Sequence, residues 1–195
     1  MRGEAVLRVI RAYDGRIVRA YCWGRFWILR QRFLDAIGRH LPPEGPVLDV
    51  GCGFGLFSLY YAQVLPRLSL RGLDINPRRI EMARRAAARL ALSNVTYDLG
   101  DAVAYRADGV YAGAYMLDIV HHVPPATVPP LLRELHRCLA PGGTLVVKDV
   151  DTRPAWKTGS GSKRARGKRK RTNPAKEAGT RVAIPAQPKR RRRIR

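Results

Sequence analysis

The stretch VLDVGCGFG, residues 47–55, places a carboxylate and three alternating glycines at the point where an apolar run ends. Gly51, Gly53 and Gly55 let the backbone turn tightly and let a ligand approach the main chain. A helix that begins directly after this loop points the positive end of its dipole at the same place, which favours an anionic group such as a carboxylate. The pattern therefore predicts a binding loop between a strand and a helix, although a plain glycine-rich turn has the same pattern.

The spacing of these glycines argues against one common class of ligand. A dinucleotide-binding loop has the pattern G-x-G-x-x-G, and counting from Gly51 places Leu56 at the third glycine position. The observed pattern is instead D-x-G-x-G-x-G. In an open α/β sheet such a loop lies at the carboxyl end of its strand, where these folds bind their ligands.

A second group of chemically capable side chains lies in MLDIVHHV, residues 116–123. A histidine accepts a proton near neutral pH, so His121 or His122, with Asp118 beside them, could deprotonate an acceptor group. The alternative is that the histidine pair supports the packing of this loop or caps the next segment. We predict no metal site, because no third ligand accompanies the pair and the three cysteines lack CxxC spacing.

The elements that must position these residues follow from an alternation of strand and helix patterns after residue 45. Apolar runs of strand length alternate with helical periodicity, and Pro77 stands at the first turn of one predicted helix. This alternation is typical of a parallel sheet with helices on both faces. The predicted strands are 47–50, 68–75, 95–99, 110–117 and 143–150, and the predicted helices are 56–65, 77–92 and 125–139.

Residues 1–44 precede this alternation and are predicted to be a helical N-terminal cap. Apolar residues recur at helical spacing over 4–40, Asp14-Gly15 interrupts them, and LPPEGP (41–46) forms a linker. The simplest interpretation is a pair of helices packed on the core. Two others stay open: a lid over a ligand, and an Arg- and Trp-rich surface resting on a membrane interface.

Taken together, these motifs resemble the class I S-adenosylmethionine-dependent methyltransferases, over roughly residues 45–152. VLDVGCGFG is similar to their first motif, LRGLDIN (70–76) to the acidic end of their second strand, and LGDA (99–102) to the loop after their third strand. MLDIVHHV and LHRCLAPGGTLVVKDV (135–150) resemble the fourth strand end, the next helix and the fifth strand of small-molecule and lipid-type members. The resemblance implies an α/β fold: a Rossmann-like, doubly wound parallel sheet of strand order 3-2-1-4-5.

The resemblance also implies which residues bind S-adenosylmethionine. Asp49 would orient the glycine loop or the amino group of the cofactor. Asp74 would accept hydrogen bonds from both ribose hydroxyls, since the two oxygens of a carboxylate suit a vicinal diol. Ile75 would lie against the adenine face, and Asp101, with Ala102 packed beside it, would accept a hydrogen bond from the adenine amino group. The residues that would pass under the methionine part are Gly51, Gly53 and Gly55.

The activity implied by this resemblance is methyl transfer to a small or lipid-like metabolite at oxygen, nitrogen or carbon. The methyl group of a sulfonium is already electrophilic, so alignment in a dry pocket supplies much of the acceleration. A base is needed only where the acceptor arrives protonated, and we predict that His121 or His122 serves a hydroxyl acceptor. The tetrad N-P-P-Y/F is absent where MLDI stands, which weighs against modification of adenine or amide nitrogen.

The pattern of strands and helices stops after Val150, and the composition changes there. Residues 1–152 contain 20 Lys+Arg and 14 Asp+Glu, whereas residues 153–195 contain 17 and 1. Because this tail has few large apolar residues, it is predicted to be disordered. Strands 6 and 7 of the family are predicted to be missing, which leaves the fifth strand as an open edge. The abundance of Arg, Ala, Gly and Pro, which have GC-rich codons, favours a shift of reading frame near residue 158.

Two alternative functions come from the tail and from the missing strands. KRARGKRKR (163–171) and the run at 189–193 could bind nucleic acid, as in an RNA methyltransferase, or an anionic membrane. The chain could instead be a catalytically silent remnant. The cysteine usage and the absence of a signal peptide or an apolar span predict a cytoplasmic protein, with a peripheral position at the membrane as the alternative.

Overall fold

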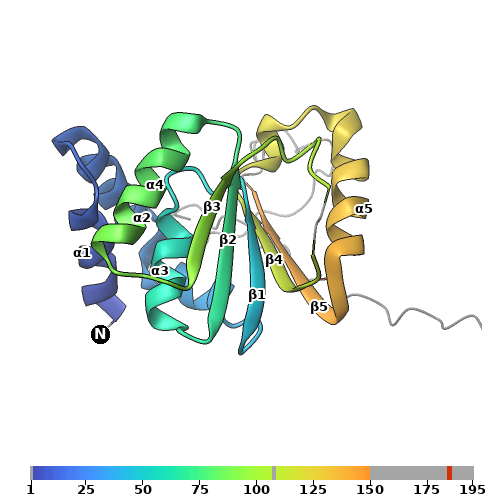
Figure 1. The fold of residues 1–195 in the computed structure, drawn as a ribbon, viewed down its shortest axis with the longest axis horizontal. Coiled ribbons are helices and arrows are strands. Elements are labelled where there is room, and N and C mark those ends of the chain that lie inside the picture. The colour runs from blue at the N-terminus through green and yellow to red at the C-terminus, as the bar shows by residue number, and fades with distance from the viewer. Residues whose placement is uncertain (1, 107–108, 150–183, 186–195) are drawn as a thin grey trace, which may run out of the picture.

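The computed structural model describes residues 2–106, 109–149 and 184–185. Five parallel strands form its centre, and helices cover both faces of the sheet (Figure 1). Two short 3₁₀ turns, η1 (Val120–His122) and η2 (Pro125–Thr127), follow the fourth strand. The other elements, in chain order, are α1 (Arg2–Ala12), α2 (Arg16–Gly38), β1 (Gly45–Val50), α3 (Leu56–Val64), β2 (Leu68–Asp74), α4 (Pro77–Arg89), β3 (Val95–Leu99), β4 (Tyr111–Leu117), α5 (Val128–Cys138), β5 (Leu139–Lys148) and β6 (Ile184–Pro185).

The parallel strands have the order β3-β2-β1-β4-β5, which confirms the predicted doubly wound sheet. β1 pairs with β2 from Gly45↔Leu68 onward, and on its other side it pairs with β4 from Val47↔Gly113 onward. The chain therefore winds outward in both directions from β1. The loops that follow β1 and β4 lie at this reversal, which is where open α/β sheets bind ligands.

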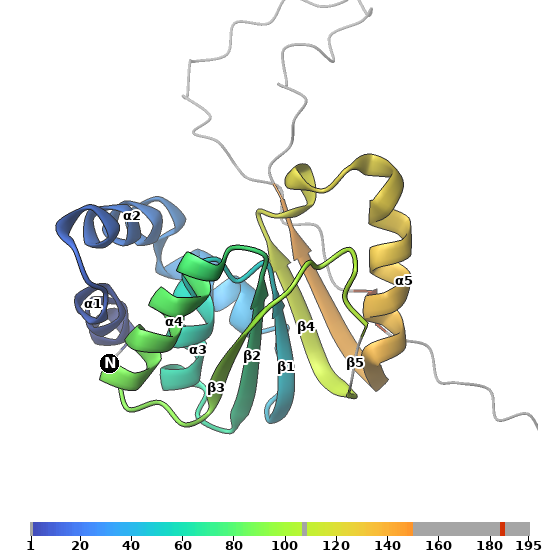
Figure 2. The ribbon, with the colours of Figure 1, turned by 45° about the horizontal axis from the view of Figure 1, so that its top comes forward.

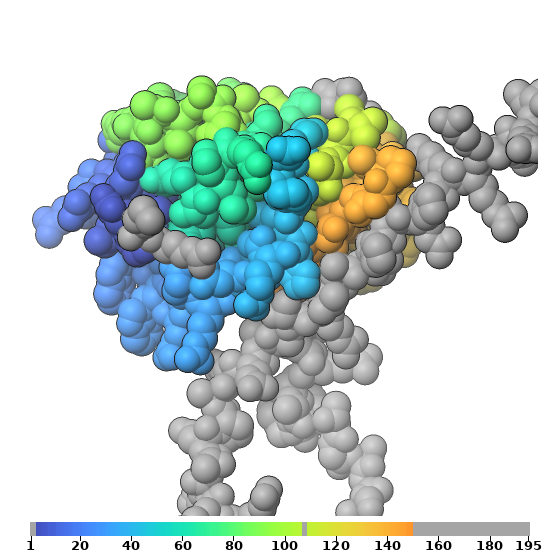
Figure 3. Space-filling model, turned by 90° about the horizontal axis from the view of Figure 1, so that it is seen from below, coloured from blue at the N-terminus to red at the C-terminus, as the bar shows by residue number. Residues whose placement is uncertain are grey.

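The two faces of the sheet carry separate hydrophobic layers. Helices α1 to α4 cover one face and α5 covers the other (Figure 2). β1 contributes to both layers because successive side chains of a strand point to opposite faces: Val47 packs with the α1–α4 layer, and Leu48 and Val50 pack with the α5 layer. Seen from the end opposite the glycine loop, the N-terminal helices and the β4–β5 pair form opposite sides of the molecule (Figure 3).

The start of α4 shows how the local sequence sets the position of a functional loop. The side chain of Asn76 accepts hydrogen bonds from the backbone N–H groups of Arg78 (3.0 Å) and Arg79 (3.3 Å), and Pro77 has no N–H to satisfy. Small residues then let the helix approach the sheet closely. The buried residues of α4 are Ile80, Ala83, Ala86 and Ala87.

The N-terminal segment is helical and breaks at Asp14-Gly15, as predicted. A second break at Arg30, with a φ of 51°, was not predicted from the sequence and divides α2 into two parts. The outer face of α2 is aromatic, with the exposed rings of Trp23 and Trp27 stacked 6.2 Å apart. Among the described residues, no helix has the length and apolar character needed to cross a bilayer. The membrane-interface interpretation of α2 stays a prediction.

The prediction for the edge of the sheet needs one correction. β5 was expected to be an open edge, but β6 pairs antiparallel with it through Thr144↔Pro185 and Leu145↔Ile184. This pairing satisfies backbone groups of β5 over a short length, which limits the edge available to another chain. The predicted disorder of the tail and the predicted change of reading frame fall on residues outside the described ranges.

Candidate active site

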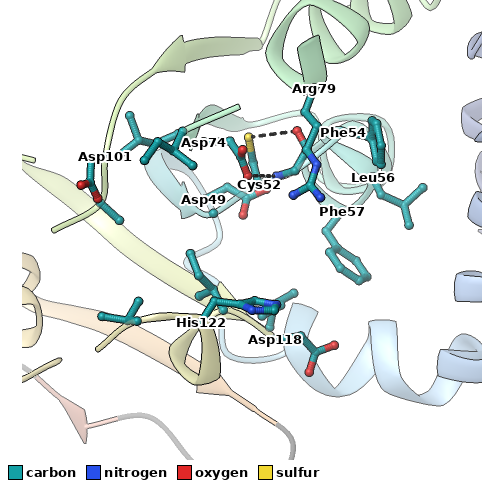
Figure 4. Close-up of a pocket in the computed structure, with 18 of the residues that line it drawn as sticks. Asp49, Cys52, Phe54, Leu56, Phe57, Asp74, Arg79, Asp101, Asp118 and His122 are labelled. Carbon is teal, nitrogen blue, oxygen red and sulfur yellow. Dashed lines mark hydrogen bonds between the residues drawn. The ribbon is translucent and has the colours of Figure 1, made fainter. Parts of the chain in front are cut away.

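A cavity of about 730 Å³ lies at the carboxyl ends of β1, β2 and β4, within the size range of small-ligand pockets. Figure 4 shows Asp49 and Asp74 on one side of this cavity and Asp118 and His122 on the other. All the residues predicted to bind a cofactor line the cavity except Gly55. The structure therefore brings together residues from the loops after four different strands.

The three glycines of the motif have different tasks, although all three adopt positive φ angles. A Cβ atom on Gly51 would lie 2.0 Å from Cδ1 of Ile119, and one on Gly55 would lie 2.4 Å from the hydroxyl of Tyr97. A Cβ atom on Gly53 would meet nothing within 4 Å. Gly51 and Gly55 thus allow Ile119 and Tyr97 to pack closely against the loop, whereas the lack of a side chain at Gly53 leaves open space beside the cavity.

Asp74 ties the glycine loop to the end of β2. One carboxylate oxygen accepts a hydrogen bond from the backbone N–H of Gly53 and the other accepts one from Asn76, both at 2.9 Å. The residue is only 8% exposed, and it lines the cavity. Because a carboxylate oxygen accepts two hydrogen bonds, Asp74 keeps capacity for two donors of a ligand.

Asp49 is a buried carboxyl group with incomplete hydrogen bonding. Its Oδ2 atom has no partner among the described residues. Burial raises the pKa of Asp49 to about 7, the nearby charge of Asp74 adds to this rise, and the hydroxyls of Tyr115 and Ser58 oppose it. A buried acceptor of this kind fits a cationic donor such as an ammonium group, which would complete its hydrogen bonding and stabilise its ionised form.

The part of the cavity around Ile75 suits an aromatic ring. Ile75 is 68% exposed although it is a large apolar residue, so a flat ligand would cover it. Asp101 and Ala102 also line this end, and one oxygen of Asp101 accepts a hydrogen bond from the backbone N–H of Val103 at 2.9 Å. Asp101 is the residue that the prediction assigned to the adenine amino group.

Asp118 is held by two cations that come from distant parts of the chain. Arg25 of α2 donates a hydrogen bond to Oδ2 at 2.8 Å, and Lys148 at the end of β5 forms an ion pair with Oδ1. Lys148 is 3% exposed, with its ammonium 5.5 Å from the ring centre of Phe33. Burial tends to raise the pKa of Asp118, but the hydrogen bonds from Lys148 and Arg25 lower it below its usual value. These contacts favour a structural role for Asp118 over proton transfer.

The two histidines both line the cavity, yet only one of them has an orienting partner in the described residues. Nδ1 of His121 lies 2.6 Å from Oδ1 of Asp149, and the backbone N–H of His121 donates to Oδ2 at 2.9 Å. The ring centres of His121 and His122 are 3.9 Å apart. The described residues contain no group of three or more His, Cys, Asp or Glu side chains placed to hold a metal ion.

Three residues of this site were missed by the reasoning from sequence: Arg25, Lys148 and Asp149. The sequence does distinguish Lys148, because it is the single lysine among the 20 Lys and Arg residues of positions 1–152. A lone lysine among arginines, within an apolar strand pattern, points to a buried cation with a specific partner. Arg25 and Asp149 carry no comparable mark, since their partners are fixed only by the fold.

Comparisons with known proteins agree with this geometry. A family model described as "Methyltransferase domain" matches residues 47–143. The ribosomal RNA small subunit methyltransferase G of Deinococcus radiodurans is 33% identical over 125 residues, which cover 62% of this chain and 49% of that protein. The demethylmenaquinone methyltransferase of Symbiobacterium thermophilum is 34% identical over 110 residues, or 55% of this chain and 43% of that protein.

A solved structure shares the same fold. The [4+2]-cyclase SpnF superimposes with a TM-score of 0.57 at 27% sequence identity, over 66% of this chain and 47% of that chain. The chain spans about half the length of the curated relatives that it matches. The similarity is therefore one of the central domain, and the relatives differ in what their names say they act on.

Proposed function

This chain belongs, through residues 47–143, to the class I S-adenosylmethionine-dependent methyltransferases, and we propose that it transfers a methyl group to a small or lipid-like metabolite. The observation that carries the proposal is the pairing of two acidic residues around open space. Asp49 offers a buried oxygen without a partner among the described residues, Asp74 offers two free lone pairs, and a side chain at Gly53 would enter open space. An amino acid joined to a ribose matches this set.

The residues of the cavity fit S-adenosylmethionine along its whole length. Asp49 would hold the ammonium group, Asp74 the ribose hydroxyls, and Ile75 the adenine face, with Asp101 at the adenine amino group. When bound, this cofactor supplies a methyl carbon that is electrophilic because it is attached to a sulfonium. The chain's own contribution is to bind, to orient and to exclude water.

The acceptor side of the cavity supports a small or lipid-like molecule. Its lining from α3, β4 and the loop after β4 combines six apolar residues with three polar ones, which are Asp118, His121 and His122. Such a lining favours an acceptor with a substantial apolar surface over a strongly hydrated one. The apolar residues on this side are Leu56, Phe57, Leu117, Ile119, Val123 and Pro124.

Asp74→Ala is the variant that tests the proposal. We expect the full chain to bind S-adenosylhomocysteine saturably in isothermal titration, and Asp74→Ala to lose about 100-fold in affinity, because it removes the ribose acceptor and frees the loop at Gly53. Asp74→Asn, which keeps one acceptor oxygen, should lose less. Asp98→Ala is the matched control, since Asp98 lies on the adjacent strand, pairs with Arg71 and does not line the cavity. Thermal unfolding of each variant shows that it is folded; a folded Asp74→Ala that binds as tightly as the parent would contradict the proposal.

Methylation of RNA is a second candidate, favoured by one relative and by composition. The matching relative from Deinococcus radiodurans is named for ribosomal RNA, and residues 153–195 carry 17 Lys+Arg. If the tail binds RNA through its phosphates, the logarithm of the binding constant should fall linearly with the logarithm of the salt concentration. Transfer of a labelled methyl group to RNA at physiological salt would favour this candidate over a small acceptor, and RNA binding that vanishes at moderate salt without transfer would reject it.

A further inference from the structure

We propose that the outer face of residues 16–29, the first part of α2, docks this protein on a bilayer that contains anionic lipids. Exposed apolar side chains that are scattered singly need no explanation, but a cluster of them marks an interaction surface. Nine large apolar side chains are exposed among the described residues, and five of the nine lie in this one segment. The five residues that define this α2 face are Ile17, Tyr21, Trp23, Trp27 and Ile28.

The helical period brings these five side chains to the outer side of the segment. Residues four or seven positions apart lie on one side of a helix, so Ile17, Tyr21 and Ile28 form one row. Trp23 and Trp27, also four positions apart, form a second row, and their rings are stacked with an angle of 11° between their planes. The α2 face is therefore a broad apolar strip along the segment.

Within the described part of the chain, no other element covers the α2 face. The segment is anchored through its opposite side, where Cys22 and Phe26 are buried. A Cβ atom on Gly24, which lies between the two rows, would meet nothing within 4 Å. The break at Arg30 ends the segment, and the rest of α2 returns to the core through residues such as the buried Leu34. In Figure 2, α2 accordingly stands at the rim of the molecule, away from the sheet.

The charge around the α2 face fits the headgroups of anionic lipids. Residues 15–34 contain five arginines and no Asp or Glu. Four of these arginines are exposed, and the fifth, Arg25, pairs with Asp118. The hydrogen bonds of Arg19 go to backbone carbonyls, which carry no net charge. Tryptophan rings prefer the headgroup level of a bilayer, and basic side chains beside them attract anionic lipids.

Other occupants fit the α2 face less well. A symmetric dimer would place this face of one copy against the same face of the other, so that the arginines of both would repel. The same repulsion disfavours a contact with residues 153–195, which carry 17 Lys+Arg and 1 Asp+Glu. Nucleic-acid bases stack on aromatic rings. Ile17, which is 87% exposed, offers a base no ring to stack on, whereas it suits an acyl chain.

The α2 face continues into the wall of the candidate active site. Tyr21 belongs to the face and also lines the cavity, and Arg25, one helical turn further on, lines the cavity as well. Because Tyr21 is 51% exposed, the cavity wall reaches the surface of the molecule there. A bilayer against the α2 face would thus lie beside the cavity, and an acceptor with an apolar chain would reach it from the lipid. The docking surface itself does not depend on the proposed methyl transfer.

Tryptophan emission from the full chain tests the docking. The chain has 3 tryptophans, so Trp156→Phe leaves Trp23 and Trp27 as the reporters. We expect vesicles of phosphatidylglycerol and phosphatidylcholine in equal amounts to shift this emission to shorter wavelength, and brominated acyl chains in these vesicles to quench it. Bromine quenches only at close range, so a chain that sediments with the vesicles without quenching binds through another segment, which would overturn the proposal. Equal quenching by vesicles of phosphatidylcholine alone would reject the anionic headgroup.

Ile28→Ser and Val110→Ser, each made in the Trp156→Phe chain, are a matched pair. The two apolar side chains are 66% and 64% exposed, but Val110 precedes β4 and is not part of the α2 face. In a quenching titration Ile28→Ser should lower the partition into the vesicles about tenfold, and Val110→Ser should leave it within about twofold. Equal effects of the two substitutions would overturn the assignment of the α2 face. So would an RNA oligonucleotide that quenches the two reporters where the vesicles do not.

Discussion

Asp49→Asn is expected to stabilise the free chain at about pH 8 by about 2–4 kcal/mol, and to weaken its binding of S-adenosylhomocysteine. The reason is that burial raises the pKa of Asp49 to about 7 in the folded chain, whereas an unfolded aspartate ionises near pH 3.9. Between these two values the folded state holds a proton that the unfolded state has lost. Stability therefore falls as pH rises through this window, by about 1.4 kcal/mol for each pH unit, and the loss is complete above about pH 7.

The amide of Asp49→Asn cannot ionise, so this variant lacks that part of the pH dependence. Urea unfolding at several pH values measures it: the stability gained by Asp49→Asn should be largest at about pH 8 and should vanish below about pH 3, where both states of the parent are protonated. Asp98→Asn, which changes a half-buried carboxylate paired with Arg71 to the same amide, should show no gain of stability with rising pH. A constant difference between parent and Asp49→Asn across this range would mean that Asp49 is ionised in the folded chain.

The same group links ligand affinity to pH. An ammonium group needs the ionised form of Asp49, so the affinity for S-adenosylhomocysteine should fall about tenfold for each pH unit below about pH 7. 5′-Methylthioadenosine has the nucleoside and the sulfur but no amino acid part, and its affinity should stay level over the same range. Asp49→Asn should remove the slope for the first ligand. Equal slopes for the two ligands would place the amino group elsewhere in the cavity.

Much of the fold follows from local sequence patterns. The strands and helices after residue 45, the glycine loop and the place of Pro77 in the first turn of α4 were predicted, because the periodicity of apolar residues and the turn residues act over a few positions. The order of the parallel strands was implied by the family resemblance, and the structure confirms it. The break of α2 at Arg30 was not predicted, because nothing in the residue type marks a positive φ angle there. β6 was missed because two residues carry no strand periodicity, so only their pairing with β5 defines them.

The candidate site likewise has residues that local sequence patterns mark and contacts that they do not. Asp49 and Asp74 stand at the ends of recognisable strands, so the sequence alone placed them at one edge of the sheet. The partners of the acceptor side are joined across the chain instead: 93 residues separate Arg25 from Asp118, and 28 separate His121 from Asp149. Long-range pairs of this kind have no local pattern, and that is why the sequence pointed to Asp118 and His121 without showing what each of them does.

Asp118→Asn is expected to destabilise the chain by about 3–5 kcal/mol, because it leaves the buried ammonium of Lys148 without its counter-charge. Asparagine suits this position better than alanine as a probe, since Asp118 has a φ of 58° and asparagine tolerates that conformation. The measured cost then reports on the lost charge and not on the backbone. Urea unfolding of parent and variant at about neutral pH gives the difference.

Removing the second charge should recover most of that loss. In Asp118→Asn combined with Lys148→Met, the methionine has a volume similar to that of lysine, and its thioether suits the neighbouring ring of Phe33. The hydrogen bond from the backbone N–H of Asp118 to the carbonyl of Lys148 does not depend on either side chain. A double variant that is less stable than Asp118→Asn would mean that Lys148 stabilises the chain through Phe33 and its other surroundings, without need of Asp118.

The cost of Asp118→Asn should also depend on pH. The hydrogen bonds from Lys148 and Arg25 lower the pKa of Asp118 in the folded chain. The contribution of the Asp118 carboxylate to stability is therefore present above the pKa of the unfolded aspartate, and it is lost as pH falls through the lower, folded value. The stability difference between parent and Asp118→Asn should shrink in acid for this reason.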